Sequence, residues 1–155
     1  MFICIYHMKS KGILNFETGN SYIGHFKNNS FNGFGEFNWT SQVKSYAGYY
    51  KNDLKSGLGL YFSKSPFEIY FGFWSKGQKE GVALEVKDLK LYFSFWKNGK
   101  RKETFLSKEE AVGYCNKVFS NRNQYSLFLS KKNIEDDLKV FFNRRYDIAC
   151  VSSGK

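Results

Sequence analysis

Residues 46–61 read YAGYYKNDLKSGLGLY, and this pattern returns, with substitutions, along most of the chain. Each copy opens with Tyr, a small residue and an aromatic at alternate positions, continues through six mostly polar residues, and enters a second arm. Full copies occupy residues 22–37, 46–61, 70–85 and 92–105, and a partial copy occupies residues 3–16. The starting tyrosines stand at 22, 46, 70 and 92, so they are separated by 24, 24 and 22 residues. Such a fixed period indicates a repeat architecture.

Each copy has the pattern of a β-hairpin. In the second copy Tyr46, Gly48 and Tyr50 alternate with other residues, so they point to one face of a strand. The polar residues 51–56 suit a chain reversal. Glycine weakens an isolated strand, so its regular placement indicates that large rings from neighbouring positions lie over bare backbone. One hairpin is marginal alone, and stacking is expected to bury a continuous face of rings and glycines.

Over residues 12–105 the pattern resembles the MORN (membrane occupation and recognition nexus) repeat, in which Tyr-x-Gly-x-Trp, a turn and Gly-x-Gly follow one another. The resemblance weakens in the third and fourth copies, where Ala83, Ser94 and Glu103 replace glycines, as expected of a terminal capping unit. The repeat-defining core residues are Tyr22, Gly24, Phe26, Gly33, Gly35, Tyr46, Gly48, Tyr50, Gly57, Gly59, Tyr70, Gly72, Trp74, Gly81, Tyr92 and Trp96.

A helical pattern follows the last copy. Ser107 and Glu110 form a capping box. One apolar stripe then contains Ala111, Tyr114, Cys115, Val118 and Phe119. Residues 125–129 are predicted to be extended, a second helix is predicted to begin near Asn133, and residues 146–151 fit a final strand. The stripe of that second helix contains Ile134, Leu138, Phe141 and Phe142.

The predicted fold is mainly β, α+β overall. Stacked antiparallel hairpins form an elongated twisted sheet over residues 1–105, and residues 106–155 form a C-terminal helical cap with two helices. The hairpin face opposite the rings is also apolar in the later copies, where it presents Phe71, Phe73, Val82, Leu84, Phe93 and Phe95. Water does not favour so apolar a second face. We expect the C-terminal helices to fold back over it, or else a partner protein to cover it.

The chain is basic, with 24 Lys and Arg against 14 Asp and Glu and a formal net charge of +10. Such an excess favours anionic lipid headgroups, nucleic acid or acidic protein surfaces as partners, although a lysine-rich composition alone also produces it. Stacking would align the predicted turns 27–32, 51–56, 75–80 and 97–102 into a basic ridge. This ridge contains Lys51, Lys55, Lys76, Lys79, Lys97, Lys100, Arg101 and Lys102, continues to Lys27, and is opposed only by Asp53 and Glu80.

The cysteines and histidines predict neither a metal site nor a nucleophile. Cys4, Cys115 and Cys150 are widely spaced and odd in number, which argues against a disulfide framework and for a reducing, intracellular compartment. His7 and His25 lie near no cysteine pair. The glycines alternate within strands and do not open a helix, so they form no phosphate-binding loop. We therefore predict a protein that is not an enzyme, with no catalytic or metal-binding residues and no cofactor.

The MORN resemblance implies a non-catalytic scaffold, an accessory subunit of a cytoskeletal, ciliary or membrane-associated multiprotein complex. The expected partners are other proteins of that assembly, or a second copy bound through terminal repeats. The expected location is the cytoplasm, cytoskeleton or cilium, peripheral to a membrane. The alternative is direct binding of anionic phospholipid headgroups through the basic turns. Nucleic acid is disfavoured, because the consensus aromatics belong to the core and not to a base-stacking surface.

Overall fold

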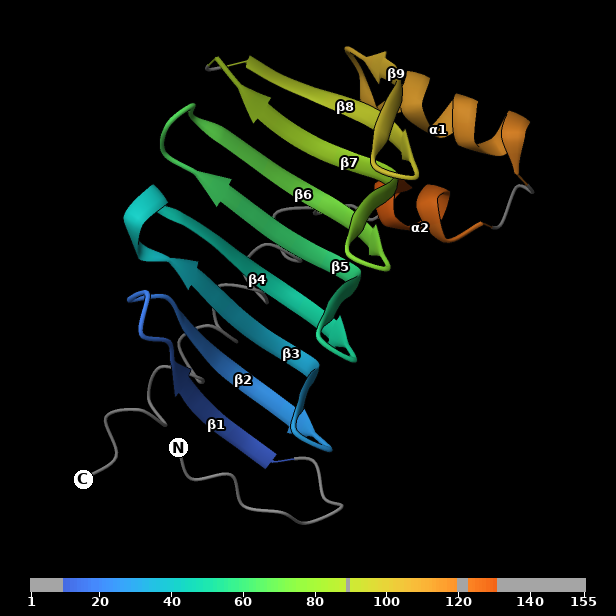
Figure 1. The fold of residues 1–155 in the computed structure, drawn as a ribbon. Helices are drawn as coiled ribbons and strands as arrows, with labels where there is room; N and C mark the ends of the chain where they lie inside the picture. Colours follow the sequence, from blue (N-terminus) through green and yellow to red (C-terminus); the bar gives the residue numbers. More distant parts are fainter. Residues whose placement is uncertain (1–9, 89, 120–122, 131–155) are drawn as a thin grey trace.

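A computed structural model describes residues 10–88, 90–119 and 123–130, and these residues form one open antiparallel sheet of nine strands and a helical C-terminal part. The strands lie side by side in chain order (Figure 1). Their bounds are Ser10–Asn15 (β1), Ser21–Lys27 (β2), Ser30–Trp39 (β3), Lys44–Lys51 (β4), Leu54–Ser63 (β5), Glu68–Ser75 (β6), Gln78–Lys87 (β7), Lys90–Lys97 (β8) and Lys100–Phe105 (β9). The predicted fold class is confirmed.

Four hairpins close through two-residue turns along one edge of the sheet (Figure 1). Both turn residues have positive φ in each hairpin, namely Asn28 and Asn29, Asn52 and Asp53, Lys76 and Gly77, and Asn98 and Gly99. Positive φ at both positions is the geometry of a type I′ turn, whose twist matches that of the flanking strands. The turns are therefore shorter than the six residues predicted for each, because the residues after each turn already belong to the next strand. A 3-10 turn, Thr40–Gln42, lies at the opposite edge, between β3 and β4.

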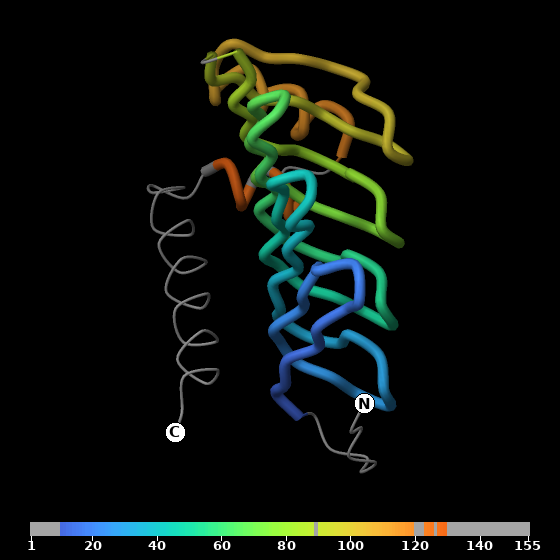
Figure 2. Tube along the Cα trace, turned by 60° about the vertical axis from the view of Figure 1, so that its left-hand side comes forward, coloured from blue at the N-terminus to red at the C-terminus, as the bar shows by residue number. Residues whose placement is uncertain are grey.

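A row of small residues crosses the sheet from β1 to β9. In register it runs through Gly12, Gly24, Gly35, Gly48, Gly59, Gly72, Ala83, Ser94 and Thr104. The register shifts beside this row in each of the four hairpins. In the first three hairpins a glycine with positive φ lies there, Gly33, Gly57 or Gly81. Such bulges bend strands, and the hairpin ends all turn to one side of the molecule (Figure 2).

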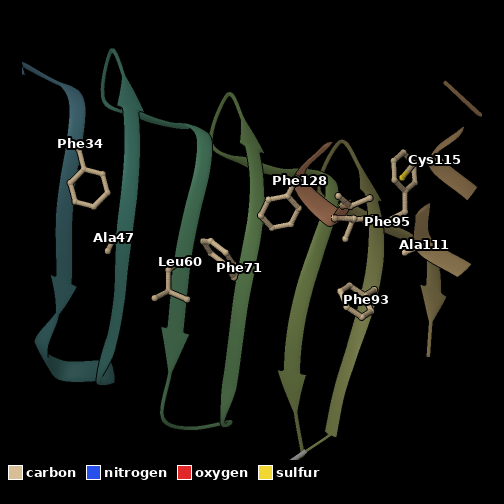
Figure 3. Close-up of a cluster of buried hydrophobic side chains, with 11 residues drawn as sticks. Phe34, Ala47, Leu60, Phe71, Phe93, Phe95, Ala111, Cys115 and Phe128 are labelled. Atoms are coloured by element: carbon tan, nitrogen blue, oxygen red, sulfur yellow. The ribbon is translucent and has the colours of Figure 1, made fainter. Parts of the chain in front are cut away.

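The bent sheet has an apolar cluster on each face. We call one the ring face, whose buried members are Tyr22, Tyr46, Tyr50, Tyr70, Trp74 and Ala83. The other, the helix-covered face, contains Phe34, Ala47, Leu60, Phe71, Val82, Phe93 and Phe95, and to these α1 (Lys108–Val118) and α2 (Gln124–Ser130) add Ala111, Cys115, Phe128 and Leu129 (Figure 3). The prediction that a C-terminal helix covers this face is confirmed for α1, and α2 covers it too, although the sequence pattern did not predict a helix there.

Helix α1 begins as the capping pattern predicts. The Ser107 hydroxyl accepts a hydrogen bond from the backbone N–H of Glu110 at 3.2 Å. The Glu110 carboxylate reaches back to the N–H of Leu106, one residue earlier than in a standard capping box. Within the predicted stripe, Ala111 and Cys115 are fully buried, whereas Val118 is 51% exposed.

The prediction of an extended segment at residues 125–129 is wrong, because these residues belong to α2. Helical spacing brings Tyr125, Phe128 and Leu129 together against the sheet and leaves Leu127 57% exposed. A strand would have divided the same residues between two faces. The helix predicted from Asn133, the strand predicted at 146–151 and the first arm of the partial repeat, with residues 3–9, lie outside the described residues.

Candidate interaction surface

Three consensus tyrosines, fully buried, organise the ring face. Each hydroxyl donates a hydrogen bond to the carbonyl oxygen three residues later, from Tyr22 to His25 (3.0 Å), from Tyr46 to Tyr49 (3.1 Å) and from Tyr70 to Phe73 (2.8 Å). A Cβ added at Gly48 would lie 2.5 Å from the Tyr46 hydroxyl oxygen, so the glycine row provides the space that the phenol occupies. Burial raises the pKa of all three phenols well above the ordinary value, so they remain neutral donors.

One position of the second arm faces these rings in all four hairpins. It is occupied by Phe31, Lys55, Lys79 and Arg101, which pair in register with Phe26, Tyr50, Trp74 and Trp96. In the first hairpin the Phe31 ring stacks on Tyr22, with 3.7 Å between centroids. In the other three hairpins a cation lies over the rings instead. The sequence pattern placed these three cations in exposed turns. Their alignment with Phe31 was the one feature of the sequence that could have predicted their contact with the rings.

The Lys55 ammonium lies among four aromatic rings. Its Nζ is 4.5 Å from the ring centroid of Trp74, 4.9 Å from Tyr46, 5.1 Å from Trp39 and 5.6 Å from Tyr61. These are cation–π distances. Burial, and secondarily the charge of Lys79, lower the pKa of Lys55 to about 8. Within the described residues, no carboxylate forms an ion pair with Lys55.

The two later cations each have an acidic partner. Lys79 Nζ lies 4.4 Å from the Tyr70 ring centroid and 2.8 Å from Oε1 of Glu68. The guanidinium carbon of Arg101 lies 5.0 Å from the Trp96 ring centroid, and Nη2 lies 2.9 Å from Oε2 of Glu85. Three equivalent cations therefore share one aromatic environment, but their charges are compensated differently.

Glu85 is fully buried on the ring face, at the position that Phe37 and Tyr61 occupy in the first two hairpins. Its carboxylate accepts hydrogen bonds from Trp96 Nε1 at 2.8 Å, from Arg101 at 2.9 Å, and from the hydroxyls of Tyr92 and Ser94. Ser94 stands in the row of small residues, where most strands carry glycine. Where the first three hairpins have a tyrosine lying over glycine, the fourth has Tyr92 and Ser94 hydrogen-bonded to a carboxylate that is buried in the third hairpin.

The predicted basic ridge divides into two sets of side chains. Lys55, Lys79 and Arg101 turn to the ring face, as described above. Five others remain exposed, namely Lys51, Lys76, Lys97, Lys100 and Lys102, and Lys27 is exposed with them. All but Lys102 belong to the hairpin ends, which follow one edge of the sheet (Figure 1). The structure therefore keeps a basic edge but with fewer free charges than the sequence pattern indicated.

Hydrogen bonds tie neighbouring hairpin ends together. The backbone N–H groups of Asp53, Gly77 and Gly99 donate to the carbonyl oxygens of Phe31, Lys55 and Lys79, at 3.1, 3.0 and 3.0 Å. The two acids of the predicted turns contribute side chains. Asp53 accepts from the N–H of Phe31 at 2.7 Å, and Glu80 accepts from the N–H of Asn98 at 2.8 Å. Beside the first of these links, a polar depression of about 540 Å³ is lined by residues that include Lys27 and Lys51.

The thiol of Cys115 lies between α1 and the sheet. Burial raises its pKa to about 11, which disfavours the thiolate that a nucleophilic role requires. Among the described residues, no three His, Cys, Asp or Glu side chains come together in a way that could hold a metal ion. A membrane-crossing helix, with the length and apolarity that this needs, is likewise not found in the described part of the chain.

These features define a protein built of stacked β-hairpin repeats, in which tyrosines lie over a row of small residues. The model of the MORN repeat family matches residues 22–43, 46–65 and 70–85, and the chain is a MORN repeat protein. The three matched segments contain the first three full copies of the pattern, and the fourth hairpin continues their register beyond the matched residues. No curated protein matches the chain.

Proposed function

We propose that this protein is a non-catalytic scaffold, an accessory subunit of a cytoskeletal, ciliary or membrane-associated multiprotein complex. MORN repeats are protein and membrane interaction modules of a non-catalytic type. A chain of stacked hairpins suits such a role, because each added repeat extends a continuous surface without requiring a new core.

The observation that carries this proposal is the difference between the two faces. Both described helices contribute to the cluster of the helix-covered face, and neither contributes to that of the ring face. The ring face carries half-buried aromatic side chains, among them Phe37, Trp39 and Tyr61. Aromatic side chains and Arg are enriched in protein interfaces, where a few such residues contribute most of the binding energy.

Affinity purification of the tagged full chain from its native cells, followed by mass spectrometry, tests the proposal. We expect a defined set of proteins to co-purify in stoichiometric amounts. The matched control is Gly48→Val, which places a branched side chain where the Tyr46 phenol lies and should lose the same set through misfolding. Recovery of the folded wild-type chain without stoichiometric partners would contradict the proposal.

The exposed lysines of the hairpin ends support a second candidate function, direct binding to anionic phospholipid. Each basic residue near an anionic membrane surface contributes about 1 kcal/mol. The sharpest test reverses Lys51, Lys76, Lys97 and Lys100 to Glu and leaves Lys55, Lys79 and Arg101 intact, because these three pack on rings. Sedimentation with phosphatidylserine vesicles, compared with phosphatidylcholine vesicles, is the measurement.

The two candidates differ in what they expect from that assay. If lipid binding is the activity, the wild-type chain sediments with anionic vesicles, the reversal abolishes this, and binding weakens steeply with salt because exposed charges are screened within about 8–10 Å. If the chain is a scaffold bound to other proteins, sedimentation is negligible before and after the reversal. We expect the second result.

A further inference from the structure

Two neighbouring hydrogen-bond donors on the ring face lack an acceptor among the described residues. Trp74 is only 7% exposed, and its indole Nε1 is buried without a hydrogen-bond partner. The Lys55 ammonium lies 4.5 Å from the centroid of the same indole, with no carboxylate paired to it. A buried donor without an acceptor costs about 1–3 kcal/mol, so an acceptor that entered here would meet two unsatisfied groups.

The following repeat shows which chemical group satisfies such donors. Trp96 is the equivalent of Trp74, and its indole N–H donates to the Glu85 carboxylate and to the Ser94 hydroxyl, both at 2.8 Å. The same carboxylate pairs with the cation Arg101. At the position of Ser94 the repeat of Trp74 has Gly72, which offers no such hydroxyl. One repeat earlier, Tyr61 occupies the position of Glu85, and its ring centroid lies 6.5 Å from that of Trp74. Trp74 therefore has the ring of Tyr61 beside it, whereas Trp96 has the carboxylate of Glu85 at the equivalent position.

We propose that Lys55 and the indole N–H of Trp74 bind a carboxylate from an acidic segment of a partner protein that lies along the ring face. This inference rests on the proposed scaffold function and names the chemistry of the partner. The carboxylate accepts the indole N–H at the edge of the Trp74 ring, in the ring plane, and forms an ion pair with the Lys55 ammonium beside it. Apolar side chains of the same segment contact the half-buried rings of Trp39 and Tyr61.

Three observations favour a protein carboxylate over a membrane headgroup. The cation lies among four rings and not at an exposed hairpin end, so a flat membrane would meet Lys51 first. The internal acceptor in the next repeat is a glutamate side chain. Glu68 and Glu85 already pair with the equivalent cations Lys79 and Arg101, so the carboxylate for Lys55 has to come from elsewhere.

The site also implies a dependence of binding on pH. The pKa of Lys55 is about 8, so the amine is mostly protonated near pH 7 and mostly neutral by pH 9. Around it, burial raises the pKa of Tyr46 and of Tyr61, which therefore stay neutral over this range, and Lys79 is held by Glu68. An ion pair at Lys55 should weaken as pH rises from 7 to 9.

The probe is a phage-displayed library of random linear peptides, selected on the folded full chain. We expect the selected peptides to be enriched in Asp and Glu next to apolar residues. A synthetic copy of the best binder should lose at least about tenfold in affinity for Lys55→Met, which keeps the length of the side chain without its charge, and should keep most of its affinity for Lys55→Arg. Lys51→Met, on an exposed hairpin end, is the matched control and should change affinity by less than about twofold.

A second measurement separates loss of binding from loss of fold. The indole N–H signal of Trp74 in a ¹⁵N spectrum should shift on peptide binding, whereas that of Trp96, already bonded to Glu85, should not. Trp74→Phe keeps a ring and removes the donor, so it should weaken binding while the thermal melt stays cooperative. Selected peptides without acidic enrichment, or equal affinity for the wild type and Lys55→Met, would overturn the inference.

Failure here is distinguishable from failure of the proposed function. If Lys55→Met still co-purifies with the full native set of proteins, the carboxylate site is overturned and the scaffold function stands. If the wild-type chain has no stoichiometric partners, the scaffold function fails whatever the peptides show. Loss of only part of the set with Lys55→Met supports both.

Discussion

Arg101 reaches the fully buried carboxylate of Glu85, with 2.9 Å between Nη2 and Oε2. A carboxylate buried in an apolar cluster is costly unless its charge is paired and its oxygens accept hydrogen bonds. Trp96, Tyr92 and Ser94 provide the remaining donors. The fourth hairpin therefore joins the array through one polar network, whereas the first three use tyrosine rings over glycine.

Replacing Arg101 by Met should leave Glu85 buried without a counter-charge. We expect a loss of about 2–4 kcal/mol of unfolding free energy, at the lower end because 36% of the Arg101 side chain stays exposed. Chemical denaturation measures this. Lys102→Met, on an exposed neighbour in β9, is the control and should change stability by less than about 0.5 kcal/mol. Equal midpoints for the two variants would show that the buried carboxylate does not need this partner.

Two glycines should respond to alanine with opposite signs. A Cβ at Gly48 would lie 2.5 Å from the Tyr46 hydroxyl oxygen and 2.7 Å from Gly59 Cα, so Gly48→Ala should displace the phenol and cost about 1–3 kcal/mol or more. Gly113 lies exposed within α1, with nothing within 4 Å of an added Cβ. Gly113→Ala should stabilise the protein by about 0.5–1 kcal/mol, because alanine is the better helix former. Thermal melts of the pair, read by circular dichroism, decide the point. Stabilisation by both substitutions would contradict the close packing of the rings on the glycine row.

A pair of leucines in α2 tests whether the helices are an integral cover. Leu129 is fully buried against the helix-covered face, whereas Leu127 is 57% exposed. Leu129→Ala should cost about 2–5 kcal/mol and increase binding of a hydrophobic dye, because it leaves a cavity under α2. Leu127→Ala, two residues away, should change stability by less than about 0.5 kcal/mol. If neither substitution alters the melt or the dye fluorescence, α2 does not stabilise the sheet.

The sequence was enough to predict the repeat, its hairpins and the face that the helices cover. These follow from the spacing of Tyr, Gly and ring positions and from the run of apolar residues at Phe71, Phe73, Phe93 and Phe95. Alternation of side chains along a strand depends only on neighbouring residues, and the same alternation recurs in each repeat. The family match to residues 22–85, in three segments, agrees with this part of the prediction.

Other features depended on geometry that spacing does not contain. Alternation along a strand gives Lys55 the same face as Gly59 and Tyr61, but the six-residue turn predicted at 51–56 left Lys55 outside any strand. In the structure the turn is only Asn52 and Asp53, and Lys55 belongs to β5 and pairs with Tyr50. The α2 segment is short and apolar at most positions, and such runs do not distinguish strand from helix by pattern. The role of Glu85 could be predicted in part from the sequence. An acid at the position where the first two repeats carry Phe37 and Tyr61 requires a cationic partner nearby.

The last prediction concerns Lys55 and the dependence of stability on pH. Its pKa falls from the ordinary 10.5 to about 8 in the folded chain, chiefly through burial. Between those two values the unfolded chain binds more protons at this site than the folded chain, so the contribution of Lys55 to stability rises with pH. Below pH 8 the penalty for the half-buried charge is fully present, and it is relieved as pH increases toward 10.5. Lys55→Met removes the penalty, so the variant should be more stable than the wild type at pH 7, and this advantage should shrink between about pH 8 and pH 10. Denaturant midpoints at several pH values measure the difference, with Lys51→Met as the control for a general loss of positive charge. An advantage of Lys55→Met that does not vary with pH would mean that the amine keeps its ordinary titration among the rings of Trp39, Tyr46, Tyr61 and Trp74.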